Sequence, residues 1–100
     1  MGLGEYISIT METYVIEFYL YCRWKDLPPT YRLYFDGELM TERTYIWHND
    51  THVLQERIPV ITDTNKATIT IEQVGQHSGS FYVKHVKINP PGLHINVDIV

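Results

Sequence analysis

TYVIEFYLYCRW, residues 13–24, is the longest run of strand-forming residues in the chain. β-branched and aromatic residues dominate it and Ala is absent, which favours a strand over a helix. Apolar or aromatic side chains occupy every second position, and the positions between them are mixed. Because successive side chains of a strand point to opposite faces, this alternation predicts one face in a core and one toward water. The predicted inward-facing residues are Tyr14, Ile16, Phe18, Leu20, Cys22 and Trp24.

The length of this run has its own consequence. Twelve residues in a strand would span roughly 40 Å, which is about twice the length of a usual strand. We therefore expect residues 13–24 to bend, to carry a β-bulge, or to serve two sheets at a corner. A strand this long can pair along both edges, so we place it inside a sheet.

The composition bounds the class of protein. The chain has 100 residues, of which 44% are hydrophobic and 20% are charged, values that are ordinary for a soluble globular domain. We expect residues 1–100 to form a single domain. Met11 could be the natural start, in which case residues 1–10 would be an N-terminal extension.

Further strand-like runs follow, separated by turn signals. The clearest turn is Asp36-Gly37, because a two-residue type I′ hairpin needs positive φ at both positions. Such a loop pairs Phe35 with Glu38, Tyr34 with Leu39 and Leu33 with Met40. The return strand would run from Glu38 to about Trp47, with a bulge or sheet switch near Thr41–Thr44.

Three later features refine the strand prediction. Pro59 lies inside the run 53–61, which favours an edge strand. The apolar alternation changes parity within 80–89, which predicts a bulge at Lys84–His85. The tail Leu93–Val100 alternates apolar and polar residues and is too hydrophobic to hang free, so it must add to its own sheet or to a neighbour's.

Together these runs predict the fold class. No helical segment is visible, and the strands recur at regular intervals with turns between them. This pattern is typical of an all-β fold, a single antiparallel β-sandwich of seven or eight strands, either jelly-roll-like or immunoglobulin-like.

Charge, cysteine content and hydropathy exclude several function classes. The formal net charge is -4 and no basic stripe is visible in the sequence, so we expect no nucleic-acid partner. Cys22 is the single cysteine; it excludes an internal disulfide and a multi-cysteine zinc site, and we expect a buried, inert thiol. No run approaches the ~20 apolar residues of a membrane span, and no secretory signal is visible. We expect no membrane partner and synthesis in the cytoplasm.

The residues that could carry chemistry are better explained by turns. His48, Asp50 and His52 could converge on a metal, but they flank a polar turn. Ser78 lies in GQHSG but lacks the spacing and the strand-to-helix context of a nucleophile elbow. We therefore predict no catalytic residue, no metal and no cofactor, and a protein that is not an enzyme. The loop-end carboxylates, which are too sparse for a calcium site, are Asp36, Glu38, Asp50 and Asp63.

Aromatic residues are the one excess, with eight Tyr, two Trp and three Phe. A row of Tyr and Trp on a sheet can anchor a protein interface or stack on sugar rings. The alternative is that half-buried sheet positions favour aromatic cross-strand pairs without any binding role. The candidate binding residues on an aromatic face are Tyr19, Tyr21, Tyr34, Tyr45 and Trp47.

The order of several segments resembles a known family. These segments are YVIEFYLYCRW, PTYRLYFDGELMTERTYIW, VLQERIPV, ATITIEQVG and SFYVKHVKIN. Over residues 11–89 they resemble small uncharacterised proteins of marine T4-like bacteriophages, of the cyanophage type. The resemblance implies a phage origin, synthesis in the host cytoplasm, and a virion or assembly role. More distantly, FDGELM and VKHVKIN resemble carbohydrate-binding β-sandwich modules, whose calcium-ligand pattern is not matched.

Two function hypotheses follow. The first is a non-enzymatic interaction module, a phage-type structural or accessory protein that forms a homo-oligomer or binds another virion or assembly protein. The second is a carbohydrate-binding β-sandwich module that uses the aromatic residues as a platform.

Overall fold

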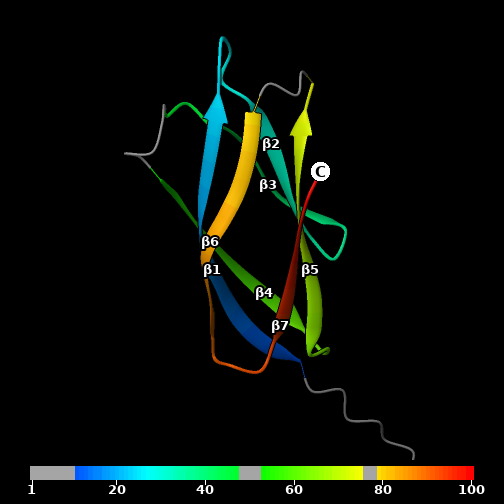
Figure 1. Ribbon diagram of the computed structural model, residues 1–100. Coiled ribbons are helices and arrows are strands. Elements are labelled where there is room, and N and C mark those ends of the chain that lie inside the picture. The colour runs from blue at the N-terminus through cyan, green and yellow to red at the C-terminus, as the bar shows by residue number, and fades with distance from the viewer. Residues whose placement is uncertain (1–10, 48–52, 76–78) are drawn as a thin grey trace, which may run out of the picture.

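The computed structural model describes residues 11–47, 53–75 and 79–100. Within these residues, seven strands form two packed sheets, which confirms the predicted all-β sandwich (Figure 1). None of the described residues belongs to a helix that could cross a membrane. The strands are β1 (Glu12–Trp24), β2 (Thr30–Phe35), β3 (Glu38–Thr44), β4 (Leu54–Thr62), β5 (Lys66–Val74), β6 (Gly79–Asn89) and β7 (His94–Ile99).

The strands are ordered β4-β1-β6 in one sheet and β3-β2-β5-β7 in the other. Neighbours pair antiparallel, as predicted, except β5 and β7, which are parallel. This exception has a simple cause. The chain crosses to the three-stranded sheet as β6 and then returns as β7, so two reversals of direction separate β5 from β7.

β1 is the central strand of the three-stranded sheet, as its length predicted. Its inward side chains from Tyr14 to Cys22 are all buried, and Trp24 at the strand end is half-buried. The predicted alternation is therefore confirmed. Burial of Cys22 is also confirmed, and desolvation raises the pKa of its thiol from 9.0 to about 11.

β6 carries a β-bulge where it pairs with β1. Glu17 lies opposite Lys87, whereas Tyr19 lies opposite Lys84, so β6 carries one extra residue between these pairs. His85 takes a positive φ of 57° within this extra segment. The bulge predicted at Lys84–His85 is thus confirmed, and it keeps Lys84 and Lys87 on the same outward side.

The β2–β3 hairpin turns at Asp36 and Gly37, whose φ angles are 47° and 84°. The first two predicted pairs are confirmed, but the third is wrong, because Leu33 lies opposite Thr41 and not Met40. Met40 is the extra residue of a second bulge and packs against the core. The strand also ends earlier than predicted, at Thr44.

β4 is an edge strand, as Pro59 predicted. Ile58 and Val60 face the core as expected, and Glu56 faces it as well, with 3% of its surface exposed. The tail forms β7 and adds to its own sheet, with Leu93 buried just before it.

Aromatic rings contact one another at one end of the core between the sheets. Tyr31, Tyr45 and Phe81 meet edge to face, with ring centroids 5.3 and 6.0 Å from Phe81. Beside them, Gly79 has no room for a side chain, since an added Cβ would lie 2.7 Å from the Cys22 sulfur and 2.8 Å from Pro29. The full set of buried hydrophobic residues is Tyr14, Ile16, Phe18, Leu20, Cys22, Tyr31, Leu33, Phe35, Tyr45, Ile58, Val60, Ala67, Ile69, Ile71, Phe81 and Leu93.

Candidate binding face

The outward face of the β4-β1-β6 sheet gathers aromatic and basic side chains. Strand alternation and register place the outward residues of β1 beside outward residues of β4 and β6. We call this surface the basic face. It comprises Glu17, Tyr19, Tyr21, Arg23, Arg57, Tyr82, Lys84, His85 and Lys87.

An aromatic stack forms the centre of the basic face. Tyr21 and Tyr82 lie opposite each other on β1 and β6, and their rings stack with centroids 4.9 Å apart and an interplanar angle of 5°. The Lys84 Nζ lies 5.6 Å from the Tyr21 centroid and 5.5 Å from the Tyr82 centroid. These are cation–π distances, so the rings and the ammonium hold one another in place.

The β6 bulge shapes the surface next to this stack. Its left-handed residue, His85, packs edge to face on Tyr19, with ring centroids 5.5 Å apart. Both residues line a depression of about 360 Å³, together with Gln55 and Val86. The bulge therefore places the His85 imidazole along the edge of this depression.

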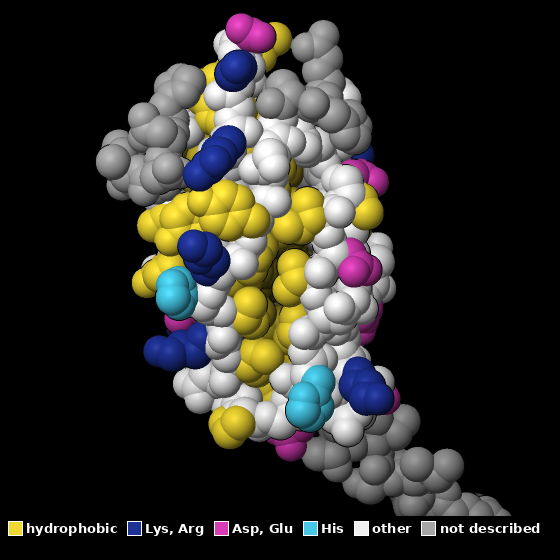
Figure 2. All heavy atoms as spheres, viewed as in Figure 1, with side chains coloured by type: hydrophobic (Ala, Val, Ile, Leu, Met, Phe, Trp, Pro, Cys, Tyr) yellow, Lys and Arg dark blue, Asp and Glu magenta, His cyan; other side chains and the backbone are white. Residues whose placement is uncertain are grey.

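The charge of the basic face is opposite to that of the whole protein. Arg23, Arg57, Lys84 and Lys87 are four of the eight Lys and Arg residues in a chain of net charge -4. Among the described outward residues of these strands, Glu17 is the one carboxylate, and its Oε1 accepts from Arg57 Nε at 3.0 Å. Figure 2 shows Lys and Arg side chains and a His beside a hydrophobic patch along the β6 side.

No basic stripe is visible in the sequence, although these cations share one face of the fold. The four cations come from three strands that are far apart in the sequence. Only the register of β1 with its two neighbours brings them onto one face.

The five candidate residues from the sequence do not form one surface. Tyr19 and Tyr21 lie on the basic face, whereas Tyr34 lies on the outward face of the other sheet. Trp47 is half-buried against the core, and its carbonyl accepts a hydrogen bond from Trp24 Nε1 at 2.8 Å. Tyr45 is fully buried and is therefore unavailable to a ligand.

Tyr45 is buried because the chain leaves β3 before reaching it. Its N–H donates to the Pro29 carbonyl at 2.8 Å, and its hydroxyl donates to the Leu20 carbonyl at 3.3 Å. Burial raises the pKa of this hydroxyl. The residues that sequence reasoning missed are Tyr82, Lys84, His85 and Lys87, and pairing the bulged 80–89 run against residues 13–24 would have pointed to them.

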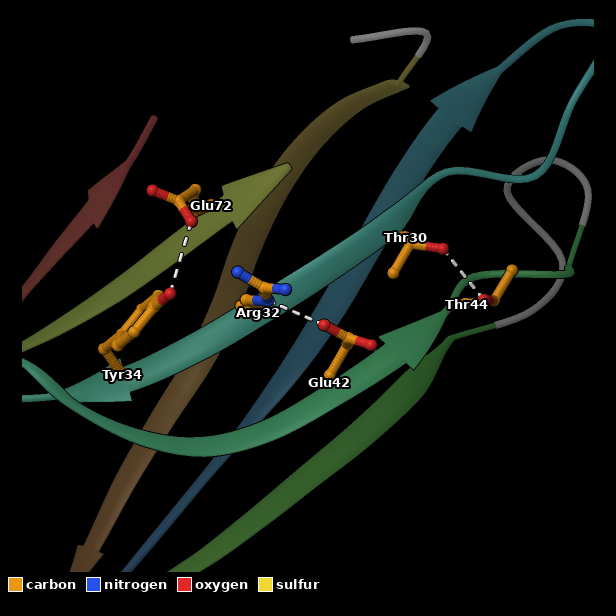
Figure 3. Close-up of polar contacts among 6 residues, drawn as sticks. All are labelled: Thr30, Arg32, Tyr34, Glu42, Thr44 and Glu72. Atoms are coloured by element: carbon orange, nitrogen blue, oxygen red, sulfur yellow. Dashed lines mark hydrogen bonds and ion pairs between the residues drawn. The ribbon is translucent and has the colours of Figure 1, made fainter. Parts of the chain in front are cut away.

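The outward face of the β3-β2-β5-β7 sheet, here called the polar face, is different in kind. Its side chains pair with one another across neighbouring strands, as Figure 3 shows. Arg32 Nε lies 2.6 Å from Glu42 Oε1. Tyr34 donates to Glu72 at 3.3 Å, and the Thr30 and Thr44 hydroxyls are 2.9 Å apart.

The buried Glu56 carboxylate links the two sheets. Its Oε1 accepts from the Tyr31 hydroxyl and from Arg43 Nε, the latter at 3.0 Å. Desolvation and the nearby carboxylate raise the pKa of Tyr31. The β3 bulge makes this cluster possible, because it places Arg43 opposite Tyr31 and on the inward side. The arrangement satisfies a buried acid internally, which is a structural use of the carboxylate.

The described residues contain no group of three or more His, Cys, Asp or Glu side chains that could hold a metal. Asp36 acts as a turn residue, since its Oδ1 accepts from the Thr68 N–H at 2.8 Å. The candidates His48, Asp50, His52 and Ser78 lie outside the described residues.

Comparisons with known proteins add no relative to this picture. No family model matches the chain, and no curated protein and no solved structure matches it either.

Proposed function

We propose that this chain is a non-enzymatic interaction module that binds an acidic partner protein through the basic face. The observation that supports the proposal is the concentration of cations and tyrosines on one face of a chain with net charge -4. A patch whose sign opposes that of the whole molecule orients an acidic partner toward this one surface.

The chemistry of the basic face suits a protein partner. Tyrosine is enriched where protein interfaces are strongest, because it combines a large apolar area with a polar tip and few rotatable bonds. Tyr19 is 36% exposed, and Tyr21 and Tyr82 are half-buried and held by their stack. Such side chains lose little conformational entropy on binding.

A carbohydrate platform has less support. A sugar ring packs against an open aromatic face. In the stack of Tyr21 and Tyr82, each ring covers one face of the other, and Lys84 approaches both rings. The residues that were expected to complete the platform, Tyr34, Tyr45 and Trp47, lie elsewhere.

The resemblance to marine phage proteins extends the proposal to a structural or accessory role. The partner would then be another virion or assembly protein. The chain would be made in the host cytoplasm and would join the virion through this contact.

A titration with a fluorescent polyglutamate peptide tests the proposal. Binding is expected at low salt and should weaken steeply as salt rises, because exposed charges are screened. Lys84→Glu combined with Lys87→Glu should lower the affinity about 100-fold, at roughly tenfold for each reversed charge. Lys25→Glu, an exposed lysine in the β1–β2 loop, is the matched control and should change the affinity less than about threefold.

Two results would overturn the proposal. One is the absence of polyglutamate binding at low salt, and the other is an equal loss for Lys25→Glu and for the paired reversals. If a sulfated polysaccharide or a single-stranded oligonucleotide bound far more tightly than polyglutamate, the basic face would remain the proposed binding site, but its partner would not be a protein.

A further inference from the structure

The two sheets end in four edge strands, and these differ in how they resist pairing with another chain. An exposed edge is usually blunted by proline, by a bulge or by charged side chains, especially lysine. Pro59 interrupts β4, a bulge at Met40 interrupts β3, and a bulge beside His85 interrupts β6. β7 contains no proline, lysine or bulge along its length.

The backbone N–H and C=O groups of β7 point alternately toward β5 and away from it. The His94 N–H donates to the Asn65 carbonyl at 2.8 Å, and the Val100 N–H donates to the Ile71 carbonyl at 2.9 Å. Even-numbered residues of β7 therefore bond to the β5 side. By the alternation of a parallel ladder, Ile95, Val97 and Ile99 direct their N–H and C=O groups outward. Within the described residues, no strand pairs with that edge.

We propose that β7 pairs antiparallel with β7 of a second copy of this chain, about a two-fold axis at Asn96. This register places Ile95 opposite the partner's Val97 in a hydrogen-bonded pair, and the outward-directed backbone groups of both copies meet. The two four-stranded sheets then form one continuous eight-stranded sheet. The contact is isologous, so it closes at a dimer.

Charge supports this register. Lys66 lies beside His94 at the beginning of β7, and Asp98 lies near its end. Glu72 follows on β5, just beyond Asp98. An antiparallel two-fold pairing sets the His94 end of one copy against the Asp98 end of the other. Opposite charges then face each other at both ends of the contact.

The apolar side of β7 supports it as well. Ile95 and Val97 are half-buried, and Ile99 remains 42% exposed. They face the opening between β6 and β7, where Figure 2 shows hydrophobic side chains in a hollow between the sheets. A second β7 would extend the sheet past this opening and bring the partner's three apolar β7 side chains toward it.

Light scattering coupled to size exclusion tests the dimer on the full chain. At about 0.1 mM, where even a micromolar association is nearly complete, the mass should be twice the 11.8 kDa of one chain. Asp98→Lys alone should give monomers, because it turns a lysine toward the partner's Lys66 at both ends of the contact. His94→Glu alone should do the same, because it sets a carboxylate against the partner's Asp98 at both ends. An equimolar mixture of the two variants should restore the dimer, since both contacts then join opposite charges.

A backbone variant tests the hydrogen bonds. Val97→Pro removes an N–H that points away from β5, so the fold should survive while the dimer weakens at least tenfold. Val97→Ala, which keeps the N–H, is the control and should weaken it less. Circular dichroism and thermal unfolding report whether each variant is folded. If Val97→Pro does not fold, the mixture of the two charge variants still tests whether β7 forms the dimer contact.

Three outcomes would reject the β7 dimer. They are a monomeric native chain at about 0.1 mM, a native mass retained by both charge variants, and a mixture that fails to restore the dimer. A chain beginning at Met11 should stay dimeric, and loss of the dimer on this truncation would also reject the β7–β7 contact. Lys84→Glu should leave the mass unchanged, so this inference and the proposed function can fail separately.

Discussion

The polar face and the basic face cover opposite sides of the same core, but they differ in how their charged side chains are paired. On the polar face, Arg32 pairs with Glu42, and Tyr34 donates to Glu72. On the basic face, Glu17 pairs with Arg57, and Lys87 lies opposite Glu17 in the β1–β6 register. Within the described residues, Lys84 contacts tyrosine rings and forms no ion pair.

The polar face therefore pairs its charges internally, whereas the basic face does so only in part. Charges that are matched within a sheet contribute a little to stability and leave nothing for a partner. Cations clustered around aromatic rings repel one another, and an acidic partner would relieve that repulsion. We therefore propose that the three-stranded sheet recognises a partner and that an edge of the four-stranded sheet mediates self-association.

The tyrosine stack should show the largest contrast between the faces. Tyr21→Ala combined with Tyr82→Ala removes the rings that position Lys84, and should lower polyglutamate affinity about 100-fold, as loss of an interface hot spot does. Tyr34→Ala on the polar face should change the affinity less than about twofold. Isothermal titration calorimetry measures both. Comparable losses from the two faces would remove the distinction between them.

Buried ionisable side chains limit the pH range over which the protein is stably folded, and therefore the range in which the two faces can be compared. Burial raises the pKa of the Cys22 thiol from 9.0 in the unfolded chain to about 11 in the folded protein. Its contribution to the free energy of unfolding is therefore complete below pH 9 and is lost as the pH rises through about 11. Tyr31 and Tyr45, whose pKa values are also raised, act in the same direction.

Unfolding by urea at pH 9 and at pH 11 measures this loss. Cys22 should account for roughly 2 kcal/mol of it, at about 1.4 kcal/mol per pKa unit with ionisation of the folded-state thiol only half complete at pH 11, and Cys22→Ala should lose correspondingly less. A free energy of unfolding that stays constant over this range would contradict the burial of these groups.

The exposed ion pair of the polar face should matter little. Glu42→Gln removes the partner of Arg32, and should lower the free energy of unfolding only slightly, because both side chains are about half exposed to solvent. Glu56→Gln is the contrast, because its carboxylate is buried between two donors, and it should cost at least about 2 kcal/mol. Chemical denaturation gives both values. If Glu42→Gln proved as costly as Glu56→Gln, the polar face could not be regarded as an ordinary solvated surface.

The smallest predicted effect has the opposite sign. Glu17→Gln removes the one carboxylate of the basic face, so polyglutamate affinity should rise about twofold at low salt. The rise should disappear at high salt. A fall in affinity would mean that Glu17 contacts the partner, and would reverse its assigned role.

Local pattern predicted much of this fold. Period-two alternation identified the buried side of β1, the Asp36-Gly37 turn identified the hairpin, and a change of parity located the β6 bulge. Each of these features depends on neighbours in sequence.

The features that escaped prediction depend on pairing between distant strands. The extra residue at Met40 reverses the side on which Arg43 lies, and so decides that Glu56 can be buried. Tyr45 looked like a surface residue because the expected strand was three residues too long. The basic face needed the register of β1 with both β4 and β6, and sequence spacing does not contain that information.

A map of the bound surface tests the central claim most directly. Isotope-labelled protein would be titrated with polyglutamate, and backbone amide shifts followed by nuclear magnetic resonance. The largest shifts should fall on Tyr19, Tyr21, Tyr82, Lys84 and Lys87, with the polar face around Arg32 unchanged. Shifts centred on the four-stranded sheet, or spread evenly over the molecule, would contradict the account.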